Sequence, residues 1–494
     1  MKIKFKNLQK WCEKNRWTPK KLAEFLGVRR QTVHNWLENR TVPKNEKIIK
    51  KFFSIAENEI EFLGEKKIKK SPKNVFEIFG KKKLRGEIRI PGAKNAALKM
   101  FCAALLTREK CVFRNVPEIS DLQLLLEIFS EIGVENFWDK KNKIVEICAK
   151  KIFPEKLKNC EKVKKFRASI LLAGPILARC GEIEILRPGG CILGARPNTI
   201  HTDGFRNFGA EIFENNEKIC GKFSRKKFKN RRILLSEASV TGTENLSIFA
   251  AGVVDECEIF FAAAEPVVAG TLKMLQKMGA EISGIGTHHL KIRGKKNLRG
   301  GVFEIPPDGI LVGTYAIAGI LTGGEILIKN VDHFELFSFY GALKKMGVNF
   351  EMQKNNLQIL PTKKLCAIPK IHTAIFPGFP TDLQSPTGVL LTQCDGESLI
   401  FETLFENRFS YLLELEKMGA KIEFLDPHRA RIFGPQNLRG AAVQSWDIRA
   451  GAAVVLAGLI ADGRTEISNI NYIDRGYENF EQNLQNLGAE IFRK

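Results

Sequence analysis

Apolar and polar residues along most of this chain follow a pattern that repeats about every 70 residues. Six times a helix pattern ends at a glycine and gives way to an alternating strand pattern, as in MLQKMGAEISG and ELEKMGAKIEF. The six glycines, at spacings of 76, 70, 68, 72 and 69 residues, are Gly133, Gly209, Gly279, Gly347, Gly419 and Gly488. A glycine directly after a helix is typical of a left-handed turn, so each repeat is predicted to contain a helix, a tight turn and a strand.

A second pattern keeps the same period. Nearly all-apolar stretches, such as AGILTGGEILIKNV and LAGLIADGRTEISNI, pass through a polar or glycine turn into a further strand. Helices that are apolar on all sides must be buried, so they are predicted to lie inside, with the sheets outside. The fold class is therefore α/β, with six repeats that divide into two groups of three and a cleft between the groups.

The first 63 residues have a different pattern, which predicts a small all-α domain. Thr18 and Pro19 are suited to begin a helix, and Gly27 supplies a turn before a second helix. The charged stretch 64–75 is predicted to be a linker.

This head resembles the repressor-type helix-turn-helix family, in which the second helix enters the major groove of DNA. The chain has a net charge of +23, and its first 70 residues hold 19 Lys and Arg against 8 Asp and Glu. The resemblance implies DNA as a partner, and it implies DNA contacts for Arg30, Gln31, Thr32 and Asn35. Two alternatives stay open: a helical module for protein contacts, and lysines that only increase solubility.

Composition limits the remaining classes. The apolar run at residues 450–461 is too short and too rich in Gly and Ala to span a bilayer, so no membrane contact is expected. The 11 cysteines lack the spacing of zinc ligands, which predicts reduced thiols, a cytoplasmic location and no structural metal.

Specific motifs along the body, from about Phe76 to Lys494, resemble those of the enolpyruvyl transferases. They are PGAKNAAL (91–98), RASI (167–170), PGGCILGARP (188–197), FPTDLQ (379–384), FENRF (405–409), WDIRA (446–450) and IDRGYE (473–478). The resemblance implies two inverted α/β barrels. Residues 76–92 and 306–494 would form the C-terminal barrel, and residues 93–305 would form the N-terminal barrel, which carries the cysteine loop.

Within that family, the cysteine loop is typical of the enzymes that act on UDP-N-acetylglucosamine. The implied reaction transfers the enolpyruvyl group of phosphoenolpyruvate to the sugar 3'-hydroxyl and releases phosphate, as the first committed step of peptidoglycan synthesis. No metal or cofactor is implied, because cationic side chains would hold the anionic substrate.

The resemblance also implies a role for each motif residue. Phosphoenolpyruvate would be bound by Lys94, Asn95, Arg196, Arg408, Arg449 and Arg475. The nucleotide sugar would be bound by Asn95, Arg167, Arg196, Ser239, Val240, Thr241, Asp382 and Leu404. The catalytic set would be Cys191, Asp382, Lys94 and Arg475. Cys191 would donate a proton or add to the substrate as a thiolate, and Asp382 would be the base.

Several positions depart from the family pattern. Thr199 stands where the family commonly has an Asp that reads uracil, Ala264 replaces an Arg, and Gly309 and Leu311 replace a charged pair. A rival interpretation is a transcriptional regulator whose body senses a nucleotide sugar without turnover. The retained proton donor Cys191 speaks against a pure sensor.

Overall fold

We describe a computed structural model in which residues 18, 22–23, 28, 31–33, 74–189, 198–224, 232–253 and 256–494 are placed. The chain divides into two units, Met1–Lys73 and Asn74–Lys494. In the first unit, residues 22–23 and 31–33 are helical, and Leu22, Ala23 and Val33 are buried. Arg30 and Asn35 lie outside the described residues. Within the described ranges, no helix has both the length and the apolar composition needed to cross a bilayer.

The second unit contains two hydrophobic cores, and we call the parts of the chain around them the first and second lobes. The first core is formed by buried residues between Ala93 and Ile305. The second is formed by buried residues from Phe76 to Ile90 and from Leu311 to Ile491. The first lobe is therefore inserted between two segments of the second lobe.

Three sheets surround the core of the first lobe. One has the order β13-β3-β5-β4, from strands Gly301–Glu304, Lys110–Arg114, Ile144–Cys148 and Glu135–Asp139. Another has the order β11-β12-β10-β9, from Glu281–Ser283, His289–Arg293, Glu256–Phe260 and Arg232–Leu234. The third has the order β6-β8-β7, from Glu182–Leu186, Lys218–Lys222 and Glu211–Glu214.

The second lobe also has three sheets. Their orders are β21-β22-β1-β23, β15-β16-β14-β2 and β17-β18-β20-β19. The strands of the first are Ala442–Gln444, Arg464–Ser468, Phe76–Phe79 and Glu490–Arg493. Those of the second are Phe350–Gln353, Asn356–Ile359, Glu325–Lys329 and Arg85–Arg89. Those of the third are Lys370–His372, Gly396–Phe401, Arg429–Gly434 and Ile422–Asp426.

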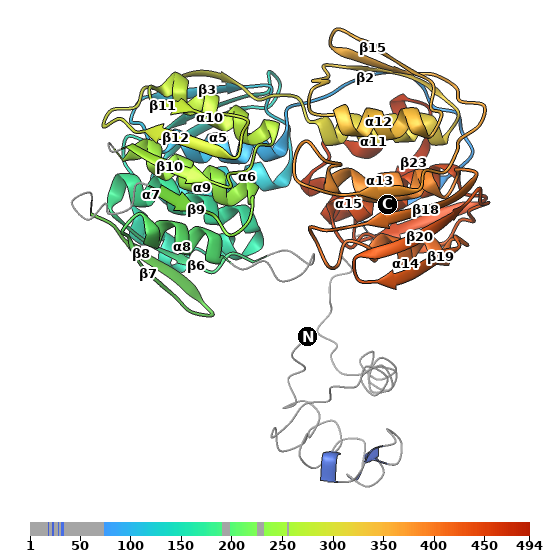
Figure 1. Ribbon diagram of the computed structural model, residues 1–494, viewed down its shortest axis with the longest axis horizontal. Coiled ribbons are helices and arrows are strands. Elements are labelled where there is room, and N and C mark those ends of the chain that lie inside the picture. Colours follow the sequence, from blue (N-terminus) through green and yellow to red (C-terminus); the bar gives the residue numbers. More distant parts are fainter. Residues whose placement is uncertain are drawn as a thin grey trace. The chain divides into compact units, whose positions relative to one another are not determined.

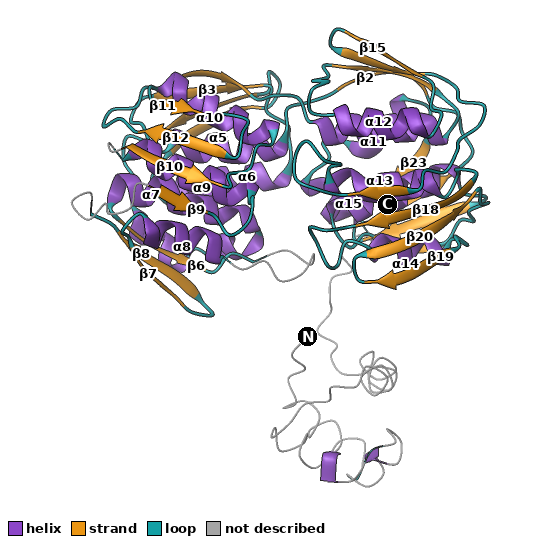
Figure 2. Cartoon of the chain, in the orientation of Figure 1, coloured by secondary structure: helices purple, strands orange, loops and turns teal. Residues whose placement is uncertain are grey.

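The helices lie between the sheets of each lobe (Figures 1 and 2). The first lobe contains α5 (Lys94–Ala104), α6 (Ser120–Glu131), α7 (Ala173–Cys180), α8 (Thr199–Asn207), α9 (Val240–Gly252) and α10 (Pro266–Met278). The second contains α11 (Gly309–Leu321), α12 (Phe337–Lys345), α13 (Thr381–Leu391), α14 (Ser410–Lys417), α15 (Ile448–Ile460) and α16 (Phe480–Asn486). Short 3-10 helices are η1 (Pro154–Asn159), η2 (Glu161–Lys165), η3 (Arg167–Leu172) and η5 (Ile470–Arg475).

The two repeating patterns of the sequence have clear structural counterparts. All six glycines of the first pattern have a positive φ, from 77° to 116°, and each follows one of α6, α8, α10, α12, α14 and α16. The apolar helices of the second pattern are buried as predicted: in α15, twelve consecutive residues from Arg449 to Ile460 are buried. Such a helix can face no water because other helices and a sheet surround it.

One sheet departs from the rest. Five sheets have four strands and include one parallel pair, such as β9 with β10. In the described part of the chain, β6 has no parallel strand beside it, and the short helix η1 packs against it instead. The repeat pattern of the sequence did not predict this difference.

Candidate active site

The predicted site residues are concentrated at the N-terminal ends of the buried helices. Lys94 is the first residue of α5, Asp382 is in the first turn of α13, and Arg449 is in the first turn of α15. Ser239 caps α9, and its Oγ accepts the N–H of Gly242 at 3.2 Å. The N-terminal end of a helix carries a partial positive charge and free N–H groups, so these ends favour anions.

A first charged cluster brings together Lys94, Asp121 and Arg475. Lys94 Nζ lies 2.6 Å from Asp121 Oδ2, and Arg475 Nε donates to Asp121 Oδ1 at 3.0 Å. Burial alone would raise the pKa of Asp121, but the charges of Lys94 and Arg475 outweigh it and lower the pKa below its ordinary value. Asp121 is therefore an anion that holds two cations side by side.

A second charged cluster has the same composition of two cations and one carboxylate. Arg449 Nη2 donates to Asp382 Oδ2 at 3.0 Å, and Arg408 Nη2 donates to Asp382 Oδ1. Burial opposes ionisation of Asp382, yet the charges of Arg449 and Arg408 hold its pKa well below the ordinary range. The side chains of Arg408 and Arg449 are only 2% and 7% exposed.

Both guanidinium groups of this cluster retain unused donors. Arg408 Nε and Arg449 Nη1 are buried, and within the described residues neither has a hydrogen-bond partner. A buried donor without a partner costs free energy, so such groups are expected where a ligand completes them. The second cluster thus has the donors for a further anionic group.

Tyr477 connects the two clusters, because it follows Arg475 in the chain and lies beneath Arg449. The Arg449 guanidinium carbon is 5.6 Å from the centre of the Tyr477 ring, a distance at which a cation is attracted to the ring face. The Tyr477 hydroxyl shares a 3.0 Å hydrogen bond with Thr314 Oγ1 inside the second lobe. The positive charge of Arg449 also disfavours the protonated form of Lys94 and lowers its pKa, although burial is the larger cause of that shift. The two clusters are therefore distinct, but their charges interact.

Contacts between the lobes occur around this site. Besides the Arg475–Asp121 pair, Lys143 Nζ lies 2.9 Å from Glu478 Oε2. The N–H of Phe376 donates to Glu265 Oε1 at 3.4 Å. Each contact joins a residue of the first lobe to one of the second, so the first charged cluster needs both lobes.

The departure at Gly309 has a structural reason. Asp308 caps α11, and its Oδ1 accepts the N–H groups of Ile310 at 2.9 Å and Leu311 at 3.2 Å. A Cβ atom at Gly309 would lie 2.6 Å from Glu335 Oε2, so a side chain cannot fit there without displacing that carboxyl. Burial, with the charges of Asp308 and Asp332, raises the pKa of Glu335 to about 8. At position 309, where the sequence departs from the charged pair of the family, the glycine leaves space for the Glu335 carboxyl.

The predicted sugar-site residues are divided between the two lobes. Asn95, Arg167, Ser239, Val240 and Thr241 are partly buried in the first lobe. Burial, together with the charge of Arg167, lowers the pKa of His201 to about 3.

On the second lobe, the N–H of Leu404 donates to Glu402 Oε1 at 2.9 Å. Cys191 and Arg196 lie outside the described residues, so their roles stay predictions. Of the other departures, Thr199 begins α8, whereas Ala264 and Leu311 are buried.

Reasoning from the sequence missed Tyr477, Thr314 and a buried pair in the first lobe. In that pair, Lys99 Nζ lies 3.3 Å from Glu244 Oε2, with the two side chains 4% and 0% exposed. Burial raises the pKa of Glu244 to about 7, and Lys99 opposes the shift only in part. The available signal was a charged residue inside each of two largely buried helices, Lys99 in α5 and Glu244 in α9.

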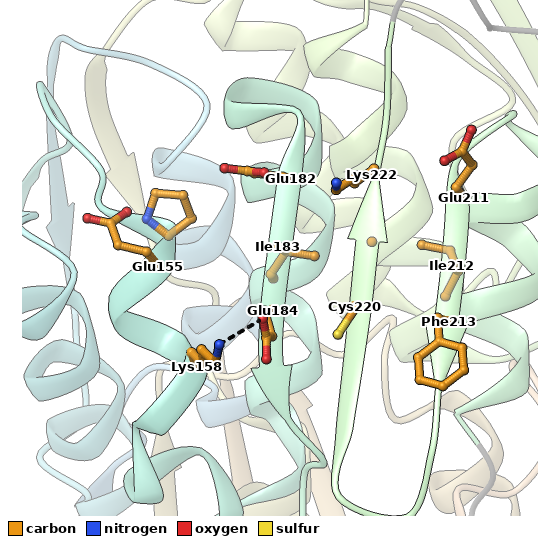
Figure 3. Close-up of a pocket in the computed structure, with 12 residues that line it drawn as sticks. Glu155, Lys158, Glu182, Ile183, Glu184, Glu211, Ile212, Phe213, Cys220 and Lys222 are labelled. Carbon is orange, nitrogen blue, oxygen red and sulfur yellow. Dashed lines mark ion pairs between the residues drawn. The ribbon is translucent and has the colours of Figure 1, made fainter.

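A hollow of about 600 Å³ lies elsewhere, on the outer face of sheet β6-β8-β7 (Figure 3). Its lining includes Glu182, Glu184 and Lys222, and an ion pair of 3.8 Å joins Lys158 to Glu184. None of the predicted site residues lines it. Its lining holds four carboxylates, on Glu155, Glu182, Glu184 and Glu211, against the two lysines Lys158 and Lys222, so it lacks the excess of cations that an anionic substrate needs.

Comparisons with known proteins identify the family of this chain. Residues 78–484 match the family model described as EPSP synthase (3-phosphoshikimate 1-carboxyvinyltransferase). The UDP-N-acetylglucosamine 1-carboxyvinyltransferase of Koribacter versatilis is 40% identical over 421 residues, which cover 85% of this chain and 96% of the relative. UDP-N-acetylglucosamine 1-carboxyvinyltransferase 1 of Caldanaerobacter subterraneus subsp. tengcongensis is 39% identical over 414 residues, covering 83% and 97%.

Solved structures show the same fold. The enolpyruvyl transferase NikO from Streptomyces tendae superposes with a TM-score of 0.75 at 23% identity, covering 86% of this chain and 99% of that one. EPSP synthase from Acinetobacter baumannii gives 0.67 at 17% identity, covering 85% and 100%. The chain therefore belongs to the carboxyvinyltransferase family, and within it to the group of UDP-N-acetylglucosamine 1-carboxyvinyltransferases.

Proposed function

We propose that this protein transfers the enolpyruvyl group of phosphoenolpyruvate to the 3'-hydroxyl of UDP-N-acetylglucosamine, releases phosphate, and so performs the first committed step of peptidoglycan synthesis. The observation that carries the proposal is the pair of clusters in which two cations share one carboxylate. Phosphoenolpyruvate has a phosphate and a carboxylate at opposite ends of a small molecule. Two separate cationic clusters match those two groups.

Each cluster is assigned to one end of this substrate. Arg408 and Arg449 bind the carboxylate, because guanidinium forks match its geometry and each has a buried donor without a partner among the described residues. Lys94 and Arg475 bind the phosphate, together with Arg196, which the sequence places in the cysteine loop. Asn95 follows Lys94 on α5 and is assigned to both substrates.

The nucleotide sugar is assigned to the first lobe and to one backbone group of the second. Ser239, Val240 and Thr241 begin α9, where free N–H groups attract the diphosphate. Arg167 and Arg196 add positive charge, and the backbone at Leu404 contacts the sugar.

The chemistry is an addition followed by an elimination. The sugar oxygen attacks the carbon of phosphoenolpyruvate that bears the phosphate, and its proton passes to Asp382. Cys191 gives a proton to the methylene carbon, which becomes a methyl group. In the second step the phosphate leaves with the proton that Asp382 had accepted, and the methyl carbon returns a proton to the Cys191 thiolate, so the enol ether forms. Every proton taken up in the first step is released in the second.

A phosphate-release assay tests this function. Wild type should release phosphate only when both phosphoenolpyruvate and UDP-N-acetylglucosamine are present. If the protein bound the nucleotide sugar normally but released no phosphate, the result would favour the sensor interpretation. Replacing UDP-N-acetylglucosamine with UDP-glucose controls for the acetamido group.

For the head, we propose DNA binding as a second function. The supporting observation is that Val33 is buried while Gln31 is exposed in the same short helix, which fits a helix with an apolar inner face and a polar outer face. The surplus of lysine and arginine in residues 1–70 adds attraction to phosphates. Removal of residues 1–70 should abolish salt-dependent retention on DNA and leave phosphate release nearly unchanged. Absence of DNA retention for the full chain at low salt would refute this function.

A further inference from the structure

Asp382 uses both of its carboxylate oxygens on the two arginines that the proposed function gives to the substrate carboxylate. Oδ1 accepts Arg408 Nη2, and Oδ2 accepts Arg449 Nη2 at 3.0 Å. A carboxylate held by two guanidinium forks is the arrangement that a bound substrate carboxylate would also need. Asp382 and the carboxylate of phosphoenolpyruvate therefore compete for the same guanidinium N–H donors.

Both two-point forks of a guanidinium, Nε with Nη2 and Nη1 with Nη2, include the Nη2 group, which Asp382 engages on both arginines. Arg449 Nη1 and Arg408 Nε have no partner in the described part of the chain, and Arg408 Nη2 also donates to the carbonyl oxygen of Thr381 at 3.1 Å. An arriving carboxylate can bind through these free N–H groups first. To be held by both forks it must then take the Nη2 groups from Asp382.

Exposure distinguishes Asp382 from Asp121, the carboxylate of the other cluster. The Asp121 side chain is 7% exposed, whereas the Asp382 side chain is 28% exposed. If Asp382 leaves the arginines, water can therefore solvate its carboxylate, whereas Asp121 without its cations would be a buried charge without compensation. Asp121 is a fixed partner of Lys94 and Arg475, and Asp382 is a partner that can be displaced.

We propose that Asp382 is an internal competitor of the substrate carboxylate, which displaces it from Arg408 and Arg449 and thereby converts it into the base of the reaction. This inference rests on the proposed function. While both arginines hold Asp382, the carboxylate is a poor acceptor for the sugar proton, because the two cations stabilise its ionised form. Once the substrate carboxylate neutralises the arginines, the basicity of Asp382 rises next to the sugar hydroxyl. The base is thus available only when the electrophile is bound.

The test measures binding of phosphoenolpyruvate alone by calorimetry. Asp382→Asn removes the competing charge but keeps the shape, so it should bind phosphoenolpyruvate about tenfold tighter or more than wild type while losing turnover. A residue that acts only as a base would leave this affinity unchanged. Asp382→Ala should also bind more tightly, which covers a failure of the Asn variant to fold.

Asp447→Asn is the matched control. Asp447 caps α15 by accepting the N–H groups of Arg449 at 2.7 Å and Ala450 at 3.0 Å, and its charge also acts on Arg408. This variant makes the same chemical change beside the same arginines without freeing a guanidinium, so its affinity should stay within about threefold of wild type. Equal or weaker binding by both Asp382 variants, or equal tightening by Asp447→Asn, would overturn the inference. If the wild-type protein released no phosphate with both substrates present, that result would instead refute the proposed function.

Discussion

Arg449→Ala is the substitution that most directly tests the carboxylate site. Arg449 is 6% exposed, donates to Asp382 at 3.0 Å, and stacks its guanidinium over Tyr477. Loss of one partner of a buried, hydrogen-bonded charge pair costs about 2–5 kcal/mol. At about 1.4 kcal/mol for each factor of ten, kcat/KM for phosphoenolpyruvate should fall by about 30-fold to a few thousand-fold.

Steady-state phosphate release at saturating nucleotide sugar measures this effect, and binding of the nucleotide sugar should barely change. Arg449→Lys keeps the charge but loses the planar fork, so it should recover only part of the activity. Arg431 offers a matched control, because it makes a 2.8 Å ion pair with Glu423 on an exposed sheet face. Arg431→Ala should cost at most about 1 kcal/mol in unfolding free energy and leave kcat/KM unchanged. Wild-type kinetics in Arg449→Ala would remove this residue from the site.

Three further substitutions test separate parts of the molecule. Gly279→Ala should lower the unfolding free energy by about 1 kcal/mol or more, because φ is +116° at this position. Gly341 lies in a helix with open space around it, so Gly341→Ala should not destabilise the protein. Equal denaturation midpoints for the two variants would contradict this prediction. Burial raises the pKa of Glu244 from 4.5 to about 7, so the folded state binds the proton more tightly and the unfolding free energy falls as pH rises across that range. Glu244→Gln should reduce this fall by up to about 3 kcal/mol. An unaltered dependence of the unfolding free energy on pH would refute the prediction. Cys191→Ala should lose nearly all turnover, and Cys191→Ser should lose much of it. Cys191→Asp should keep some turnover and should resist epoxides that alkylate the thiol. Equal turnover in Cys191→Ala and wild type would refute the catalytic assignment of Cys191.

Much of the fold could be predicted because local rules determine it. A left-handed glycine between helix and strand leaves a signal within a few residues, and all six glycines, from Gly133 to Gly488, have the expected positive φ. The burial of α15 likewise follows from its own apolar sequence. The absence of a parallel strand beside β6, among the residues that the structure describes, left no such signal, since the surrounding repeat pattern is the same in all six segments.

The sequence names candidate members of the site but does not indicate how they are connected. Lys94, Asp382, Arg408, Arg449 and Arg475 stand in recognisable motifs. That Asp121 joins Lys94 to Arg475, which is 354 residues away from Asp121 in the chain, depends on how the two lobes pack. Sequence spacing carries no information on such a distant contact, and the same holds for the shared use of Asp382.

The insertion of the first lobe into the second has a consequence for the order of folding. Residues of the first core follow one another without interruption, so this lobe can fold as soon as its segment is complete. The second lobe cannot, because β1, near its start, pairs with β22 and with β23 at residues 490–493. Closing so long a loop is slow, and until it closes the edges of β1 stay unpaired. The second core is therefore completed last, and Arg449 and Arg475 reach their carboxylates only after nearly the whole chain has been made.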